Sequence, residues 1–210
     1  MDHHESDSIV VGVDVGGPKK GFHAVALQDG HYREQFSTLI PTDIAAWCRR
    51  LKASVVGIDA PCRWSLTGRA RPCERALAAE GLHIFATPSQ AKGEAHPFYR
   101  WMVKGADLYC CLAPDYPLFD GQLSATDRIC FETFPHAVAC ALARKPLSAK
   151  RKRADRSRVL REAGVSTEAL TNIDWIDAAL CALAAHHLVT GRSKHYGDTA
   201  EGFIVVPLSG

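Results

Sequence analysis

Two short apolar runs carry the same pattern and limit the folds open to this chain. Residues 9–14 read IVVGVD and residues 54–59 read SVVGID, so each run is rich in β-branched residues and ends in an aspartate. Runs of this length and composition are typical of buried central strands. Because neighbouring strands of an open α/β sheet end at a common functional edge, we expect Asp14 and Asp59 to lie close together there.

The segments around these two runs predict an α/β fold with a mixed sheet. Residues 22–28 and 31–39 read as two further strands, joined by an Asp29-Gly30 turn that tolerates the positive φ angles hairpins need. A helix is expected from residue 41, with Thr42 as a candidate N-cap. The predicted order up to Asp59 is therefore β-β-β-α-β.

The second half of the chain is expected to complete the sheet after an interruption. We interpret residues 62–127 as an insertion that carries short helices and proline-broken loops, and not as a separate domain. The elements predicted in and after it are helices at 72–80 and 98–111, a strand at 129–134, helices at 136–143, 154–163 and 174–190, and an edge strand at 203–206. A flexible N-terminus (1–8) and one domain (9–210) are thus expected.

Composition excludes some classes of protein and leaves others. The chain has 210 residues, of which 47% are hydrophobic and 23% are charged, enough to fill the core of one globular domain. No apolar run approaches the roughly 20 residues of a membrane span, and the polar N-terminus does not resemble a signal peptide. Eight cysteines occur without a C-x-x-C pair. We expect a cytoplasmic protein with reduced thiols, without a membrane or zinc site.

An acidic pair begins the predicted final helix. Asp174 and Asp177 are three residues apart and therefore point to one face of a helix that is otherwise apolar. One interpretation makes Asp174 a cap and Asp177 a partner of the helix dipole. The other places both beside Asp14 and Asp59, because four carboxylates suit two-metal chemistry with Mg²⁺ or Mn²⁺.

The sequence also resembles a known family over nearly its whole length. The phrases that carry the resemblance are GVDVGGPKKGFHAV (12–25), VVGIDAP (55–61), RARPCERAL (69–77), ICFETFPHA (129–137), REAGV (161–165) after a basic stretch, DWIDAALCALAAHH (174–187) and GFIVVP (202–207). In this order they are similar to the "domain of unknown function 429" family, whose members are regarded as predicted RNase H-like nucleases. The resemblance implies an RNase H-like mixed sheet of βββαβαβα order, flanked by helices, with an insertion after the fourth strand.

The same resemblance implies roles for the acidic residues. Within the RNase H-like superfamily, the acidic pattern is most similar to that of Holliday-junction resolvases. It implies that Asp14, Asp59 and Asp177 are catalytic metal ligands and that Asp174 is a further ligand. Glu132, in FETFP, matches a Y-E-x-x-P phrase of the family. Glu132 is therefore an additional ligand, the partner of a nearby arginine, or a solvent-facing residue of an edge strand.

Basic residues are candidates for contacts with phosphate. Arg71 and Arg75 match an R-x-C-D-like phrase of the family, with Glu74 in place of aspartate, and a guanidinium suits phosphate; a salt bridge on an exposed helix is the alternative. Residues 144–161 contain nine basic residues and one acid. Nucleic-acid binding is expected there, or else a solvated face. The expected contacts are Lys150, Arg151, Lys152 and Arg153, together with Lys20 of the first hairpin.

Aromatic residues of the insertion admit two interpretations. Trp64, His96, Phe98, Tyr99 and Trp101 are expected either to stack on nucleic-acid bases or to pack beneath a long loop.

Three functions remain open from the sequence. The first is a Mg²⁺- or Mn²⁺-dependent nuclease with DNA or RNA as its partner. The second is an actin or sugar-kinase-like phosphotransferase, because residues 14–17 fit a D-x-G-G-like turn, although such proteins usually contain two copies of the fold. The third is a non-catalytic nucleic-acid or protein-binding module that keeps the same shell.

Overall fold

The computed structural model describes residues 8–124 and 128–209, so most of the predicted flexible N-terminus lies outside the described residues. The strands are β1 (Ile9–Val15), β2 (Phe22–Gln28), β3 (His31–Thr38), β4 (Val55–Asp59), β5 (Ile129–Glu132), β6 (Ser193–Asp198) and β7 (Gly202–Pro207). The helices are α1 (Pro41–Leu51), α2 (Pro72–Ala79), α3 (Gln90–Ala95), α4 (Arg100–Leu112), α5 (Pro135–Ala143), α6 (Lys152–Glu162) and α7 (Ile173–Val189), with 3-10 turns η1 (Pro97–Tyr99) and η2 (Ala149–Arg151).

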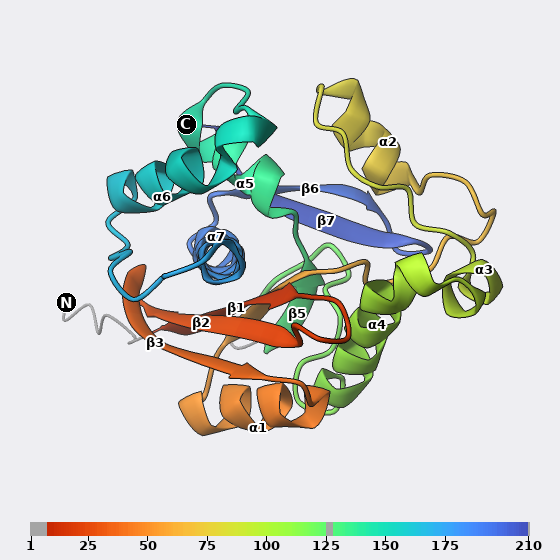
Figure 1. Cartoon of the computed structure of the whole chain (residues 1–210), viewed down its shortest axis with the longest axis horizontal. Coiled ribbons are helices and arrows are strands. Elements are labelled where there is room, and N and C mark those ends of the chain that lie inside the picture. The colour runs from red at the N-terminus through yellow and green to blue at the C-terminus, as the bar shows by residue number, and fades with distance from the viewer. Residues whose placement is uncertain (1–7, 125–127, 210) are drawn as a thin grey trace.

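The described strands form one mixed sheet in the order β3-β2-β1-β4-β5-β7-β6 (Figure 1). β1, β2 and β3 are antiparallel, whereas β4 and β5 continue the sheet parallel to β1. The predicted α/β class and mixed sheet are confirmed. In the parallel register of β1 and β4, Asp14 lies directly beside Asp59.

The last strands differ from the prediction. Residues 203–206 belong to β7, which pairs with β5 on one side and β6 on the other, so the prediction of an edge strand is wrong. All six residues of β7 are buried, in keeping with an interior position. The edge strand at this end of the sheet is β6, which the sequence analysis missed because its half-exposed polar residues carry no apolar alternation.

Two predicted helix caps are also corrected. α1 begins with Ile40 as its N-cap and Pro41 in the first helical position, so Thr42 is not the cap. In α7 the side chain of Asn172 accepts a hydrogen bond from the amide of Trp175 and is the N-cap. Asp174 therefore lies within the first turn of α7, where its side chain is free to serve another partner.

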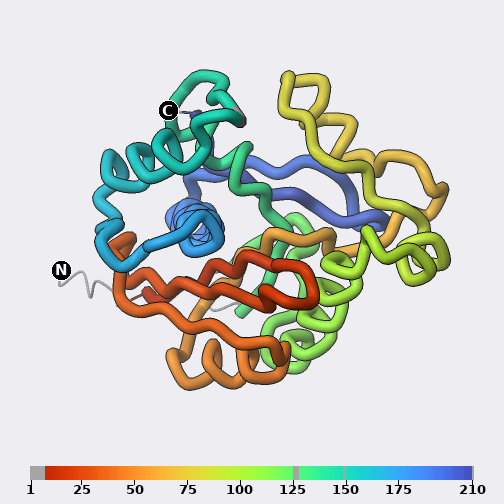
Figure 2. The backbone as a smooth tube through the Cα atoms, in the orientation of Figure 1, coloured from red at the N-terminus to blue at the C-terminus, as the bar shows by residue number. Residues whose placement is uncertain are grey.

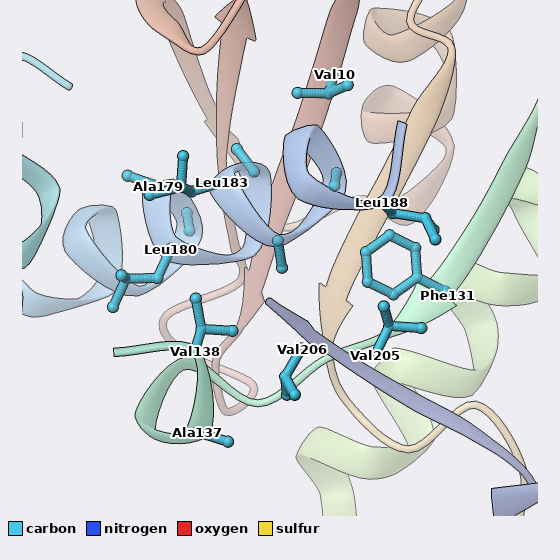
Figure 3. Packing of buried hydrophobic residues seen from close by; sticks show 14 of the residues in the cluster. Val10, Phe131, Ala137, Val138, Ala179, Leu180, Leu183, Leu188, Val205 and Val206 are labelled. Carbon is cyan, nitrogen blue, oxygen red and sulfur yellow. The ribbon is translucent and has the colours of Figure 1, made fainter. Parts of the chain in front are cut away.

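Helix α7 crosses the sheet in the middle of the molecule, with α5 and α6 packed on its outer side (Figures 1 and 2). Its residues from Ile176 to Ala185 are all buried, as expected of a helix that is apolar on every face. Leu180 and Leu183 of α7 lie among Val138 of α5 and Val10 of β1 in this core (Figure 3).

Two glycines of the sheet allow α7 to approach it closely. A Cβ atom on Gly12 would overlap the backbone of Ala178 and Ala182, and one on Gly57 would lie 2.7 Å from the carbonyl oxygen of Cys181. Glycine has no Cβ, so backbones can meet at these positions. The glycine of each of the two apolar runs is thus explained by the helix that covers it.

Helices α1 and α4 cover the opposite face of the sheet (Figure 1). The described part of the predicted insertion, residues 62–124, holds α2, α3, η1 and α4. Helix α4 packs against α1 and β1, whereas α2 packs against β6 and β7. In the described ranges, none of the helices is long and apolar enough to cross a lipid bilayer. All eight cysteines are free thiols.

Candidate active site

The strand-end aspartates share one face of the sheet. Val10 and Val55, four residues before Asp14 and Asp59 respectively, pack in the core beneath α7. Because side chains alternate along a strand, residues four apart point to the same side. Asp14 and Asp59 therefore lie next to each other on the face that α7 covers.

The first turns of α7 add two more carboxylates to this edge. Close packing of α7 on Gly12 and Gly57 brings Asp177 to the ends of β1 and β4, where only 8% of Asp177 is exposed. The charges of Asp59, Asp177 and Asp174 all act on Asp14. The structure thus gathers the four predicted aspartates at one end of the sheet.

Burial and mutual repulsion set the acidity of this cluster. Burial, followed by the charge of Asp59, raises the pKa of Asp14 well above its ordinary value. Burial and the charge of Asp177 raise the pKa of Asp59 to about 8. Burial also raises the pKa of Asp177, against the opposing effect of Arg156. Crowded carboxylates of this kind favour protons or a bound cation.

Two basic side chains face the cluster. Arg156 of α6 donates from Nη1 to Oδ1 of Asp177, and Arg156 is 9% exposed. The Nε of Arg156 is buried and has no hydrogen-bond partner in the described part of the chain. Lys20, in the hairpin between β1 and β2, donates from Nζ to both carboxylate oxygens of Asp174 at 3.0 Å.

Arg156 is a site residue that the sequence analysis missed. The sequence signal that could have identified Arg156 is its spacing, because it lies three and four residues before the buried Val159 and Leu160. That spacing puts Arg156 on the inward face of α6. Lys152 lies one turn earlier and is close enough for its charge to lower the pKa of Asp59 and Asp177.

The chemistry of the acidic cluster fits a hard divalent cation, because carboxylate oxygens are the ligands Mg²⁺ prefers. Within residues 8–124 and 128–209, however, no three Asp, Glu, His or Cys side chains stand in an arrangement that holds a metal ion. Asp177 and Asp174 are engaged instead with Arg156 and Lys20. Binding of an ion therefore requires a change of side-chain position at one or both of these pairs.

Glu132 points away from the cluster for a reason of strand geometry, although its charge also helps to raise the pKa of Asp59. Its register partner in β4 is Ile58, which packs on the face covered by α1 and α4. Glu132 therefore leaves the sheet on the side opposite Asp59. It is 2% exposed and lies on an interior strand, so the interpretation as a solvent-facing edge residue is wrong.

The partner of Glu132 is Arg71, as one of the three interpretations predicted. Nη2 and Nη1 of Arg71 donate to Oε1 and Oε2 of Glu132 at 2.6 and 2.8 Å, and Nε donates to Glu74 at 2.9 Å. Arg71 is fully buried, and Nη1 also donates to the carbonyls of Arg63 and Glu201. The prediction that Arg71 grips phosphate is corrected, because its donors are directed to protein groups.

The remaining predicted contacts to substrate are exposed. Arg75 lies on the outer side of α2 and donates to the carbonyl of Ala70. Exposed side chains on η2 and the start of α6 form a basic surface, with Arg153 anchored on the carbonyl of Thr171 just before α7. This surface comprises Lys150, Arg151, Lys152 and Arg153.

A pocket of about 330 Å³ adjoins the acidic cluster through Asp59. Its walls are mostly apolar and include Trp101, Phe85 and Phe134, with Arg71, Glu74 and Glu132 beneath them. Of the five predicted aromatics, only Trp101 lines this pocket among the described residues. Trp64 packs on Gly93 of α3, as the alternative interpretation predicted.

The comparisons with known proteins place the chain in a family. A family model described as "Protein of unknown function (DUF429)" matches residues 12–201. The chain belongs to this family. The matched segment of this DUF429 protein contains every aspartate of the cluster, Arg156 and the pocket residues. A search of the curated proteins and a search of the solved structures each returned no match.

The raised pKa of Asp59 predicts how the stability of the DUF429 protein changes with pH. Its folded pKa is about 8, whereas an unfolded aspartate titrates at roughly 3.9. Between these values the folded state binds more protons, so the stability of the metal-free protein should fall as pH rises. Asp59→Asn should remove this loss and stabilise the protein at pH 8 by at least about 1 kcal/mol, the scale of one pKa unit.

Urea denaturation in EDTA at pH 5 and pH 8 measures this effect. The matched control is Asp107→Asn, which changes an exposed aspartate of α4. Identical pH dependence of the wild-type and Asp59→Asn proteins would contradict the prediction.

Proposed function

We propose that this protein is a divalent-metal-dependent nuclease of the RNase H-like superfamily that hydrolyses phosphodiester bonds. The observation that carries the proposal is the convergence of Asp14, Asp59 and Asp177 from three separate elements on one sheet edge, beside the basic helix α6. The antiparallel β3-β2-β1 unit followed by parallel β4 and β5 supports the finer fold assignment. On this view β6 and β7 extend the βββαβαβα order.

Asp14, Asp59 and Asp177 are the residues that would hold Mg²⁺ or Mn²⁺, with Asp174 at the edge of the group. When bound, such ions supply an activated water and stabilise charge on the leaving oxygen. A cation among the carboxylates would also relieve the repulsion that raises their pKa values. The acids in this proposal position the ions and do not themselves attack the substrate.

Arg156 and the basic surface would act on the phosphates. Arg156 has a buried, unpartnered Nε beside Asp177, so it has a donor to offer an anion that enters the cluster. A guanidinium in a poorly solvated site interacts strongly with phosphate oxygens. The exposed Lys150, Arg151 and Arg153 would attract the strand on either side, and binding should weaken as salt concentration rises.

The phosphotransferase alternative receives less support from the first hairpin. The amide of Gly16 donates to the carbonyl of Gly21 at 2.8 Å, and the amides of Lys20 and Gly21 donate to Gly17. A phosphate-binding turn needs backbone amides directed at the ligand. Here these three amides are used within the hairpin itself.

Asp14→Asn should reduce Mn²⁺-dependent cleavage of nucleic acid to background. The change keeps the size of the side chain but removes the negative charge at the position where the charges of all three other aspartates act. Cleavage of labelled single-stranded and structured DNA and RNA measures the effect, and thermal denaturation reports the fold.

The Asp107→Asn protein serves again as the control and should cleave like the wild type. Retained cleavage in Asp14→Asn would overturn the assignment of the site. A wild-type protein that binds no Mn²⁺ at millimolar concentration in calorimetric titration would favour the non-catalytic binding module.

A further inference from the structure

We propose that the pocket beside Asp59 receives the base of an unpaired nucleotide, so that the enzyme acts on single-stranded or unpaired segments of nucleic acid. This inference rests on the proposed nuclease function and specifies its substrate class. It is carried by the composition of the pocket, by its position relative to the carboxylates, and by exposed aromatic and basic side chains around its mouth.

The pocket has the character of a base-binding site. Trp101 comes from α4, Phe85 from the loop after α2, and Phe134 from the residue that precedes α5. These three aromatic side chains line one space of about 330 Å³ together with small apolar residues. Aromatic faces bind any base by stacking, without reading its sequence. The apolar residues are Val15, Ala60, Pro61 and Ile84.

The position of the pocket connects it to the reaction. Asp59 belongs both to the acidic cluster and to the pocket lining, so the pocket opens beside one carboxylate of the cluster. A base that occupies the pocket would place its own sugar and phosphate beside Asp59. The pocket and the cluster thus bind adjoining parts of one nucleotide.

A row of aromatic rings, of which Phe85 and Phe98 are exposed and Tyr99 is half-buried, continues outward from the pocket. Phe85 is 68% exposed and lies 5.8 Å from Phe98, which is 53% exposed and lies 5.1 Å from Tyr99, measured between ring centroids. Large apolar side chains exposed in a group mark interaction sites. These rings meet edge to face, and their exposed surface is available to bases that follow the one in the pocket, in keeping with one of the two interpretations of Phe98 and Tyr99.

The wall that carries Phe85 is held in place from within. The amide and hydroxyl of Thr87 both donate to Glu74, with the amide at 3.0 Å from Oε1. Glu74 in turn accepts from Arg71, which is paired with Glu132. The buried ion network thus fixes the loop two residues from Phe85, and a pocket that needs no ordering on binding gains affinity.

Basic side chains lie where the backbone of the strand would pass. Arg100 and Lys104 of α4 line a second hollow together with Pro18 of the first hairpin and Glu94 of α3, and this hollow lies next to Gly17, which borders the pocket. Lys104 lies with Nζ 4.7 Å from the ring centroid of Phe22. A base paired in a duplex is stacked on both faces and cannot enter such a pocket without being flipped out. The aromatic pocket and the basic side chains near its mouth together favour an unpaired nucleotide as the ligand.

Binding of fluorescent oligonucleotides tests the pocket separately from catalysis. The measurements use the Asp14→Asn protein in EDTA, so that no cleavage occurs. Trp101→Ala in this background should weaken binding of a single-stranded oligonucleotide by about 5- to 150-fold, the range for loss of one stacked base. Trp101→Phe should restore most of the affinity, because it keeps an aromatic face. A fully paired duplex of the same sequence should bind more weakly than the single strand.

Ile40→Ala provides the control, because it removes an exposed apolar side chain at the start of α1, outside the pocket. If Trp101→Ala in the Asp14→Asn background binds the single strand as tightly as the Asp14→Asn protein alone, with an unchanged thermal midpoint, the pocket proposal is overturned. Equal binding of duplex and single strand would also overturn it. If these binding results overturn the pocket but the wild-type protein shows Mn²⁺-dependent cleavage, the nuclease proposal still stands. Trp101-dependent binding without any wild-type cleavage supports the pocket and rejects the nuclease.

Discussion

Replacement of Arg71 with methionine should lower the free energy of unfolding by about 3 to 5 kcal/mol, the usual result of removing one partner from a buried ion pair. Arg71 is fully buried, and its partners Glu132 and Glu74 are each 2% exposed. Methionine fills much of the volume but leaves both carboxylates without their counter-charge. Urea denaturation at pH 7 measures the loss.

Arg75→Met is the matched control for this prediction. Arg75 lies four residues along the same helix but is exposed, so the change should alter stability by no more than about 0.5 kcal/mol. A wild-type urea midpoint for Arg71→Met, combined with weaker binding of nucleic acid, would instead restore the role in phosphate binding that the sequence suggested.

Gly12→Val should destabilise the protein by about 3 kcal/mol, at the upper end of the range for overpacking in a core. The new Cβ would overlap the backbone of Ala178 and Ala182, which a rotamer change cannot relieve. Helix α7 must move away from β1, and Asp177 moves with it. We therefore expect loss of Mn²⁺ binding in calorimetric titration as well as a lower urea midpoint.

Two further substitutions control this experiment. Gly12→Ala introduces the same overlap with a smaller side chain and should give a smaller loss that remains measurable if the valine variant does not fold. Gly17→Ala should leave stability within about 0.5 kcal/mol, because no heavy atom lies within 4 Å of its added Cβ. Wild-type stability of both Gly12 variants would show that α7 does not lie on this glycine as closely as the structure has it.

Local patterns in the sequence predicted the elements that carry the acidic residues. The β-branched runs at 9–14 and 54–59 correspond to β1 and β4, and the apolar segment at 174–190 corresponds to α7. These elements can be predicted from the sequence because a buried strand or helix needs apolar residues along its whole length. The proximity of Asp14 and Asp59 followed from the same reasoning.

The partners of side chains were decided by the tertiary structure. A strand pattern shows that neighbours alternate, but the face each set occupies depends on register with other strands. Glu132 could therefore be read as a ligand, although its register with Ile58 turns it to the opposite face and toward Arg71. Likewise, helical spacing places Arg156 on the same face as Val159 and Leu160, but only the packing of α6 against α7 shows that Arg156 meets Asp177.

By itself, then, the sequence determined the family, the mixed α/β sheet and the four aspartates at its edge. Only the folded chain decided that Arg156 faces Asp177, that Arg71 is internal, and that β7 lies inside the sheet. The physical reason is that each of these contacts joins segments far apart in the chain. Such pairings depend on the packing of whole elements, and no local periodicity records them.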